Sequence, residues 1–162
     1  MTIDESKKNH VEWLDNAVSA FDEGDHKDGD LLSHDWMQWA LMLPQPRNIG
    51  EARECQFVVL HRVDTFRDYL LTERNTALQN VRGHGYRIVP PNEQARYAAE
   101  TALAQVVKGL SRGRKLMTHT RVALLTDDEK KRHIDTEVRL SGIGQIVSRQ
   151  RKDVFQLFHA AK

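Results

Sequence analysis

The chain has 162 residues, of which 40% are hydrophobic and 29% charged, a composition typical of a globular protein and too apolar for a fully disordered one. Its single cysteine, Cys55, excludes an intramolecular disulfide and a cysteine-based zinc cluster within one chain. The first residues lack the apolar core of a signal peptide, and no apolar run is long enough to span a bilayer, so we expect a cytoplasmic protein with no membrane partner.

The formal net charge of +1 hides an asymmetry along the chain. Residues 1–35 carry three basic and ten acidic residues, whereas residues 36–162 carry 21 basic and 13 acidic ones, a balance of +8. The basic residues 36–162 favour a polyanionic partner. Residues 1–35, the acidic leader, would compete with that partner if they lay over the basic part of the chain. An ordinary solvated linker and an ordinary basic surface explain the same numbers equally well.

The first half of the chain predicts helices separated by polar or proline-rich breaks. Residues 6–22 form the first, because apolar residues recur at helical spacing: Val11, Leu14, Val18 and Phe21. Residues 22–30 have no apolar side chain and predict a linker that does not pack. Residues 33–43 form the second helix, with Ser33 as its N-cap and Pro44 beyond its end. Its predicted core face consists of Trp36, Trp39, Ala40 and Leu43.

Residues 51–73 predict a third helix, and a β-hairpin follows it. The apolar face of this helix is predicted to lie in the core and comprises Phe57, Leu60, Val63, Phe66 and Leu70. Arg53, Arg62, Arg67 and Arg74 lie outside that face, as in a helix that enters a major groove, although any solvated helix has the same pattern. In the hairpin, strands near Leu78–Val81 and Tyr86–Val89 flank a turn with Gly83 and Gly85. Arg82, His84 and Arg87 in this segment are suited to contacts with phosphates or the minor groove.

The hairpin segment Val81-Arg82-Gly83-His84-Gly85-Tyr86-Arg87-Ile88 resembles the wing of the winged-helix effector domains of bacterial response regulators. That wing typically reads Val-Arg-Gly-x-Gly-Tyr-Arg followed by an apolar residue. The resemblance implies a winged-helix module, with its helix-turn-helix, over residues 33–91 and a recognition helix over residues 58–73. The 32 preceding residues are too few for a receiver domain, and the family has no long helical tail. The resemblance therefore implies DNA binding rather than phosphorelay signalling.

Residues 92–162 are helical in pattern. Asn92 is a predicted N-cap, an apolar stripe runs from Ala95 to Leu110, and residues 111–115 are predicted to interrupt the helix. Thr126 and Glu129 have the spacing of a capping box at the start of a second helix, whose apolar stripe extends to Phe158. Two long helices indicate a hairpin or a dimer-forming arm; packing onto the preceding module is the alternative. Two basic clusters could follow phosphates: one comprises Arg112, Arg114, Lys115 and Arg121, and the other Arg149, Arg151 and Lys152. The alternative is that these basic runs are ordinary solvated faces.

No catalytic motif is present, and the eight histidines lack metal-ligand spacing, so we expect no enzyme, no cofactor and no metal. The expected fold is mainly α with a small β-hairpin: an N-terminal helix and acidic linker (1–32), a winged-helix-like module (33–91) and a long helical C-terminal arm (92–162). The expected function is binding of double-stranded DNA by a homodimeric regulator of transcription or replication, of the compact kind common on mobile genetic elements. The alternative is a protein-binding inhibitor or adaptor built on the same scaffold without DNA contact.

Overall fold

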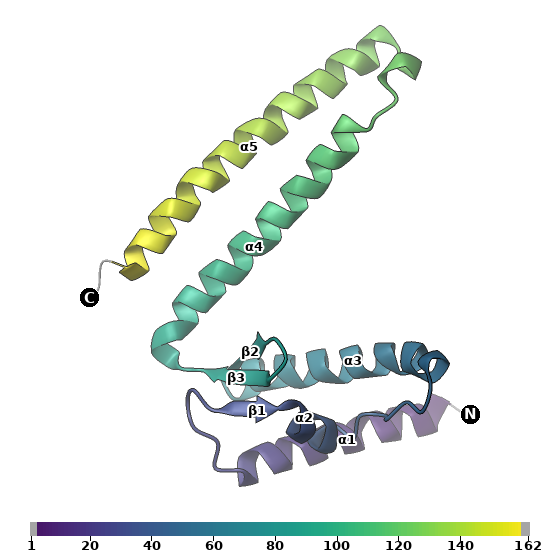
Figure 1. The fold of residues 1–162 in the computed structure, drawn as a ribbon, viewed down its shortest axis with the longest axis vertical. Helices are drawn as coiled ribbons and strands as arrows, with labels where there is room; N and C mark the ends of the chain where they lie inside the picture. Colours follow the sequence, from purple (N-terminus) through teal and green to yellow (C-terminus); the bar gives the residue numbers. More distant parts are fainter. Residues whose placement is uncertain (1–2, 160–162) are drawn as a thin grey trace. The chain divides into compact units, whose positions relative to one another are not determined.

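The structure is a computed structural model that describes the backbone of residues 3–159 and the side chains of residues 12–153, 156 and 158. The chain divides into two compact units, the N-terminal unit (residues 1–94) and the C-terminal unit (residues 95–162) (Figure 1). Helices dominate both units, and the only sheet among the described residues is small and antiparallel. The expected fold class, mainly α with a small β-hairpin, is confirmed.

The N-terminal unit begins with α1 (Ile3–Glu23), β1 (Leu31–Ser33), α2 (His34–Ala40) and α3 (Ile49–Glu73). The hairpin of β2 (Ala77–Val81) and β3 (Gly85–Val89) follows, and β3 lies between β1 and β2 in the sheet. Leu78 of β2 pairs with Ile88 of β3, and Leu32 of β1 pairs with Tyr86 on the other side of β3. Strand β1 was not expected from the sequence, because it is only three residues long and directly precedes a helix.

All of these elements contribute to one hydrophobic core. Its buried members are Trp13 and Ala17 from α1, Leu32 from β1, Met37 from α2, Leu41 just after it, Val63, Phe66 and Leu70 from α3, Leu78 from β2 and Ile88 from β3. The N-terminal helix therefore belongs to the same unit as residues 33–91. This differs from the expected organisation, in which a boundary separated residues 1–32 from the module. The side chain of Val11, the first residue of the predicted α1 stripe, lies outside the described residues.

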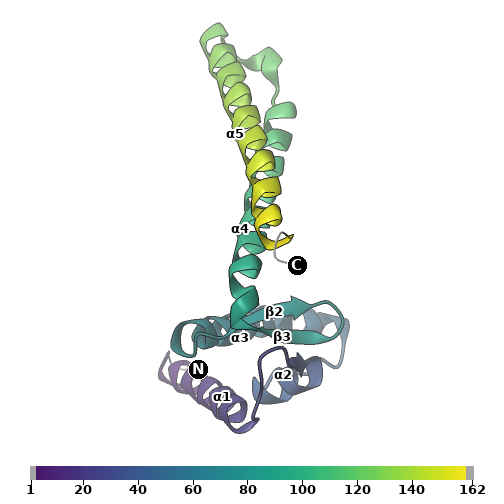
Figure 2. The same cartoon turned by 90° about the vertical axis from the view of Figure 1, so that its left-hand side faces the viewer.

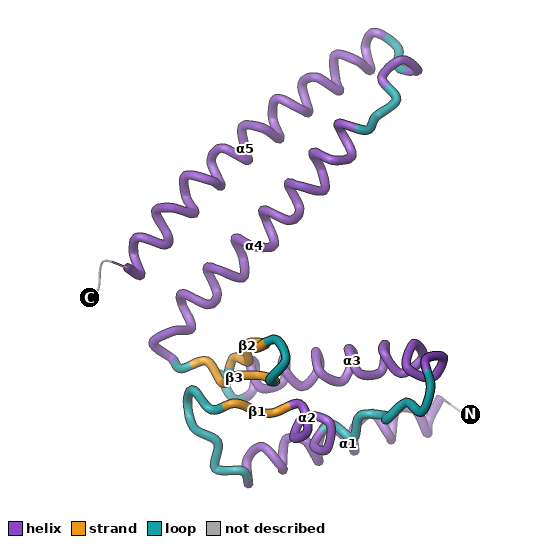
Figure 3. The backbone as a smooth tube through the Cα atoms, in the orientation of Figure 1, coloured by secondary structure: helices purple, strands orange, loops and turns teal. Residues whose placement is uncertain are grey.

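The acidic segment after α1 is attached to the sheet rather than being a free linker. The amide of Gly29 donates to the Ile88 carbonyl oxygen at 3.0 Å, and the Ile88 amide donates to the Asp30 carbonyl oxygen at 2.9 Å. The His26 ring lies between Phe21 and Trp36, with centroid distances of 5.3 and 5.2 Å. Figure 3 shows this loop running from the end of α1 into β1. The expectation that residues 22–30 do not pack is wrong, because their backbone and the His26 ring provide the contacts that their apolar content does not.

Side-chain caps define the starts of α2 and α3. The Ser33 hydroxyl accepts from the Trp36 amide at 3.1 Å, which confirms the predicted N-cap of α2. The Asn48 side chain accepts from the Glu51 amide at 2.9 Å and caps α3. Helix α3 therefore starts at Ile49, two residues before its predicted start. Helix α2 ends at Ala40 rather than Leu43, and Met42 takes a left-handed backbone with φ of 50°.

Two predicted core faces are partly wrong. In α2 the buried residues are Met37 and Ala40, whereas Trp39 is 67% exposed. In α3 only the second half reaches the core, so Phe57 is 78% exposed and Leu60 is also exposed. Regular spacing identified the helical face correctly but not where along the helix the core ends.

The C-terminal unit is a helical hairpin of α4 (Pro91–Thr118, whose first turn belongs to the N-terminal unit) and α5 (Asp127–His159), joined through a short 3₁₀ turn at Val122–Leu124. The two helices run antiparallel and side by side, as both views show (Figures 1 and 2). Helix α4 starts at Pro91, a favoured first helical position, so Asn92 lies in the first turn and is not the cap. It continues without interruption through residues 111–115, which corrects the predicted break.

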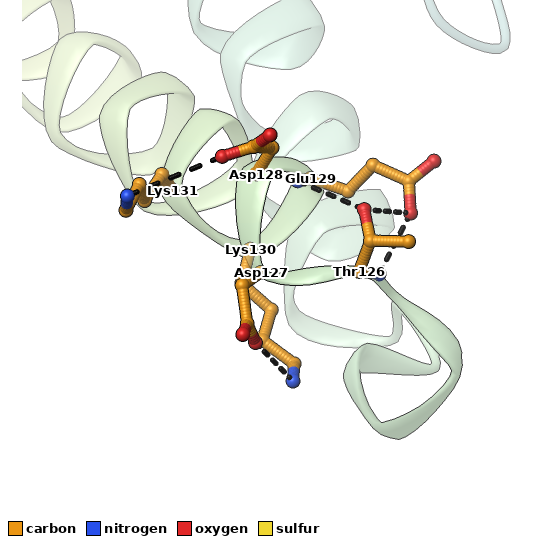
Figure 4. Close-up of polar contacts among 6 residues, drawn as sticks. All are labelled: Thr126, Asp127, Asp128, Glu129, Lys130 and Lys131. Atoms are coloured by element: carbon orange, nitrogen blue, oxygen red, sulfur yellow. Dashed lines mark hydrogen bonds and ion pairs between the residues drawn. The ribbon is translucent and has the colours of Figure 1, made fainter.

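The capping box at the start of α5 is confirmed (Figure 4). The Thr126 amide donates to the Glu129 carboxylate at 2.8 Å, and the Glu129 amide donates to the Thr126 hydroxyl at 3.4 Å. These contacts satisfy backbone donors that a helix start leaves unpaired. They also lower the pKa of Glu129, since both the amide and the hydroxyl of Thr126 hydrogen-bond its charged form.

Packing between α4 and α5 is thin. The Leu140 side chain of α5 lies 3.7 Å from the position that a Cβ would take at Gly113 of α4. The Arg114 guanidinium of α4 lies across Gly144 of α5, where a Cβ would be 3.1 Å from Arg114 Cζ. Nevertheless, no described side chain of residues 95–158 is buried, so the described part of this unit has no core of its own.

Candidate nucleic-acid interface

The segment that resembles a wing has its tip at the turn between β2 and β3. Gly83 has φ of 80°, and the His84 amide donates to the Val81 carbonyl oxygen at 3.0 Å, which closes the turn. One ring nitrogen of His84, Nδ1, lies 3.1 Å from the Arg82 carbonyl oxygen. Within the described part of the chain, the exposed Arg82 guanidinium has no hydrogen bond or ion pair. The tip therefore presents one cation and one imidazole to solvent, as the sequence predicted.

Gly85 has a separate role from Gly83. Its φ is 140°, a region almost restricted to glycine, and a Cβ there would overlap the Leu32 carbonyl oxygen of β1. The Gly-x-Gly spacing of the hairpin thus combines a turn residue with a residue that lets β1 approach β3. The second glycine of the motif that resembles a wing is therefore required for β1 to pair with β3 in the three-stranded sheet.

Arg87 is directed toward the chain rather than toward solvent. Its two terminal nitrogens donate to the two oxygens of the Glu93 carboxylate at 2.8 and 3.1 Å. This bidentate pair joins β3 to the first turn of α4 and raises the pKa of Arg87, mainly through the hydrogen bond.

The three arginines predicted as DNA contacts in the third helix and at its end also bind within the N-terminal unit. Arg62 donates to the carbonyl oxygens of Leu41 and Met42, at 3.0 and 2.5 Å, and its guanidinium lies 5.4 Å from the centroid of the Trp13 ring. Desolvation lowers the pKa of Arg62. Arg67 donates to the Leu78 carbonyl oxygen at 3.2 Å.

Arg74, at the end of α3, forms an ion pair with Asp22 of α1 at 2.9 Å. Hydrogen bonding and charge attraction within this pair lower the pKa of Asp22 and raise that of Arg74. The pair ties together the ends of two helices that are far apart in the sequence. Arg62, Arg67 and Arg74 therefore hold the fold of the N-terminal unit.

The outward face of α3 has the wrong chemistry for a DNA groove. Away from the core it presents Phe57, Leu60, Asp64 and Asp68, all exposed, with Arg53 as the one exposed arginine near its start. Two carboxylates repel phosphates, and two large apolar side chains offer no hydrogen bond to base edges. Separately, Trp39 and Met42 line a shallow hollow of about 360 Å³ together with α1. The exposure of Phe57, Leu60 and Trp39 could not be read from the sequence, because all three have the spacing of core residues.

In the C-terminal unit, the structure brings together basic clusters that are separated in the sequence. Arg112 of α4 and Arg151 of α5 line one hollow of about 500 Å³, which Lys108 also borders. Arg114 and Arg149 line a second hollow of about 410 Å³. Lys115, the remaining predicted contact in the arm, is exposed in the last turn of α4.

The division into units changes the distribution of charge inferred from the sequence. The N-terminal unit has ten basic and sixteen acidic residues, a net −6, because it includes the acidic leader. The C-terminal unit has fourteen basic and seven acidic residues, a net +7. The cationic part of this protein is therefore the helical hairpin.

No family model, curated protein or solved structure matches this chain. Among the described residues, no group of three or more His, Cys, Asp or Glu side chains is arranged to hold a metal ion. Nor does any helix in the described part of the chain combine the length and apolarity needed to cross a bilayer.

Proposed function

We propose that this chain binds double-stranded DNA, as a small regulator of transcription or replication acting in the cytoplasm. The main support is the convergence of basic side chains from α4 and α5: Lys108, Arg112 and Arg151 line one hollow, which Glu100 also borders, on a unit of net charge +7. Guanidinium pairs separated by a hollow are suited to phosphate oxygens, which dominate affinity for duplex DNA.

The N-terminal unit contributes its wing in this proposal. Helix α3 directly precedes the β2–β3 hairpin, as the resemblance to winged-helix effector domains implies. The contact groups are Arg82 and His84 at the exposed tip, since Arg87 is paired with Glu93. The outward face of α3 takes no part, because Asp64 and Asp68 would face phosphates. Contacts of this kind read the backbone more than the bases, so the recognition is semi-specific.

A salt-dependent titration of the full chain with a duplex, a single strand and an RNA tests the proposal. The logarithm of the duplex association constant should fall linearly with the logarithm of salt concentration, and each lost phosphate contact should reduce the slope by about 0.9. We expect Arg82→Ala to reduce the slope by about one unit, and Arg112→Ala with Arg151→Ala by about two.

Arg53→Ala is the matched control, because Arg53 is an exposed arginine on the outward side of α3. It should leave affinity and slope unchanged. A reduced slope for Arg53→Ala with no change for Arg82→Ala would move the interface to α3. No duplex binding at about 50 mM salt, where phosphate contacts are strong, would refute DNA binding altogether.

A second candidate is a protein-binding module without DNA contact, which the exposed Phe57 and Leu60 beside acidic residues favour. Aromatic side chains are enriched in protein interfaces and charged ones are depleted from their centres. Duplex binding by the wild type separates the candidates, and Phe57→Ser should leave duplex affinity unchanged if the wing and the helical hairpin bind DNA.

A further inference from the structure

Helix α5 has an apolar face that is directed away from α4. Leu140, Gly144 and Val147 lie toward α4, as their contacts and shared hollow with that helix show. A residue two positions along a helix is rotated by about 200°, so Val138, Gly142 and Ile146 lie on the opposite side. Val138 is 65% exposed and Ile146 is 63% exposed. Nothing in the described part of the chain covers this face.

Gly142 has no explanation within a single chain. It lies in the interior of α5, where glycine destabilises a helix relative to alanine. A Cβ at Gly142, like one at Gly109 of α4, would meet no atom within 4 Å, whereas a Cβ at Gly113 or Gly144 would meet the other helix of the hairpin. The absence of a side chain at Gly142 is useful where another backbone approaches closely.

Charged residues on the same face are arranged symmetrically about Gly142. Four residues before and after it are Val138 and Ile146. Seven residues before and after it are Asp135 and Arg149, which have opposite charges. Offsets of four and seven residues keep a side chain on one face of a helix.

The symmetry continues one turn further. Eleven residues before and after Gly142 are Lys131 and Asp153, again of opposite charge. All of these charged side chains are exposed, and Arg149 also borders the open hollow that Arg114 of α4 lines. Successive positions along this row are spaced about 3.7 residues apart on average, close to the 3.6 of a straight helix, so the row runs nearly along the helix axis.

We propose that α5 pairs antiparallel with α5 of a second copy of this chain, across a two-fold axis at Gly142. In such an interface the same patch serves both copies, and every contact occurs twice. Val138 packs against the partner's Ile146, and Asp135 forms an ion pair with the partner's Arg149. Farther out, Lys131 meets the partner's Asp153.

The charge pattern selects this occupant and this direction. A parallel pair would place each charged residue beside its own copy, and like charges in contact repel. The antiparallel pair makes both charge contacts attractive and brings the two backbones together at glycine. Within one chain, Asp135 contacts Arg139 at 3.3 Å and Lys131 contacts Asp128 at 4.0 Å; these pairs are exposed and can exchange for contacts between copies.

The experiment is a charge exchange in the full chain, followed by sedimentation equilibrium without nucleic acid up to about 100 µM, a range that includes weak dimers. We expect a dimer for the wild type. Asp135→Arg alone and Arg149→Asp alone should each raise the dimer Kd at least about tenfold, through two repulsive contacts per dimer. The double variant should restore the Kd to within about threefold of the wild type, since opposite charges again face each other.

Rescue in the double variant cannot arise within one helix, because residues 135 and 149 are separated by about 21 Å along its axis. Glu137→Arg is the control for a charge change on another side of α5, and it should leave the Kd unchanged. A monomeric wild type, or a double variant no better than the single ones, would overturn the proposal.

Gly142→Leu provides a second test that does not involve charge. It should abolish the dimer while helix content, measured by circular dichroism, is retained. Gly109→Leu is matched to it, because Gly109 is also a mid-helix glycine with open space around it, in α4. Equal dimerisation by the two leucine variants would exclude Gly142 from the interface. These measurements contain no DNA, so they are independent of the proposed function.

Discussion

Gly85→Ala should destabilise the N-terminal unit far more than Gly83→Ala, although the two glycines are two residues apart in one turn. Alanine at residue 85 must adopt φ near 140° and place its Cβ against the Leu32 carbonyl oxygen, which is backbone and cannot rotate away. The strained backbone costs about 1–3 kcal/mol. Forcing β1 away from β3 adds about 1–3 kcal/mol, as other overpacked sites do. The expected loss is therefore about 2–6 kcal/mol in the free energy of unfolding.

Gly83→Ala is the matched comparison. Gly83 has φ of 80°, but a Cβ there would meet nothing within 4 Å. Only the cost of left-handed backbone remains, about 1–2 kcal/mol. The difference in the free energy of unfolding between the two alanine variants therefore measures the cost of forcing β1 away from β3.

The assay is thermal unfolding followed by tryptophan fluorescence. All three tryptophans, at positions 13, 36 and 39, belong to the N-terminal unit, so their emission reports that unit even if the C-terminal unit melts separately. For a unit of this size each kcal/mol shifts Tm by about 4–8 °C, so Gly85→Ala should lower Tm by at least about 8 °C. Equal Tm values for the two variants would refute the argument that β1 packs against Gly85.

Three further outcomes are expected. Arg62→Ala should lower the stability of the N-terminal unit by about 2–3 kcal/mol in the same assay, because two carbonyl oxygens lose a charged donor, whereas Arg53→Ala should change it by less than about 0.5 kcal/mol. Thr126→Ala should destabilise α5 by about 1 kcal/mol through loss of its cap, seen as a lower helix melting temperature by far-ultraviolet circular dichroism. Asp22→Asn should remove a stabilisation that is present above about pH 4, the unfolded carboxyl pKa, and is lost in the wild type as pH falls through the lowered pKa of Asp22. A wild-type advantage over Asp22→Asn that grows on acidification would contradict the assigned ion pair with Arg74.

Local sequence signals predicted the elements of this chain well. The spacing of apolar residues located all the long helices. Ser33 was recognised as a cap from its residue type with Asp35 in the first turn, and Thr126 from its residue type with Glu129 three positions on. Glycine and proline placed the hairpin between Leu78 and Val89. Each of these signals operates over a few residues, so it needs no knowledge of the rest of the fold.

Signals that depend on tertiary contacts were not predictable in the same way. Trp39 has the spacing of a core residue, but α2 is short and its buried side is set by α1 and α3. Strand β1 exists because β3 offers a free edge beside Leu32. An exposed arginine and an arginine bound to a distant carbonyl oxygen, such as Arg62, are identical in the sequence. Whether a predicted contact arginine is free to bind a ligand therefore depends on polar partners that are distant from it in the sequence.

The opposite charges of the two units have a practical consequence for handling the protein. A chain of net charge +1 should be retained weakly by any ion exchanger, yet one of its units has a net charge of −6 and the other +7. Each unit offers a charged surface to the resin of opposite sign, so the protein should be retained on both cation and anion exchangers at pH 7. Oppositely charged units of different molecules should also attract one another, so solubility should be lowest at low ionic strength. Added salt should raise solubility by screening this attraction.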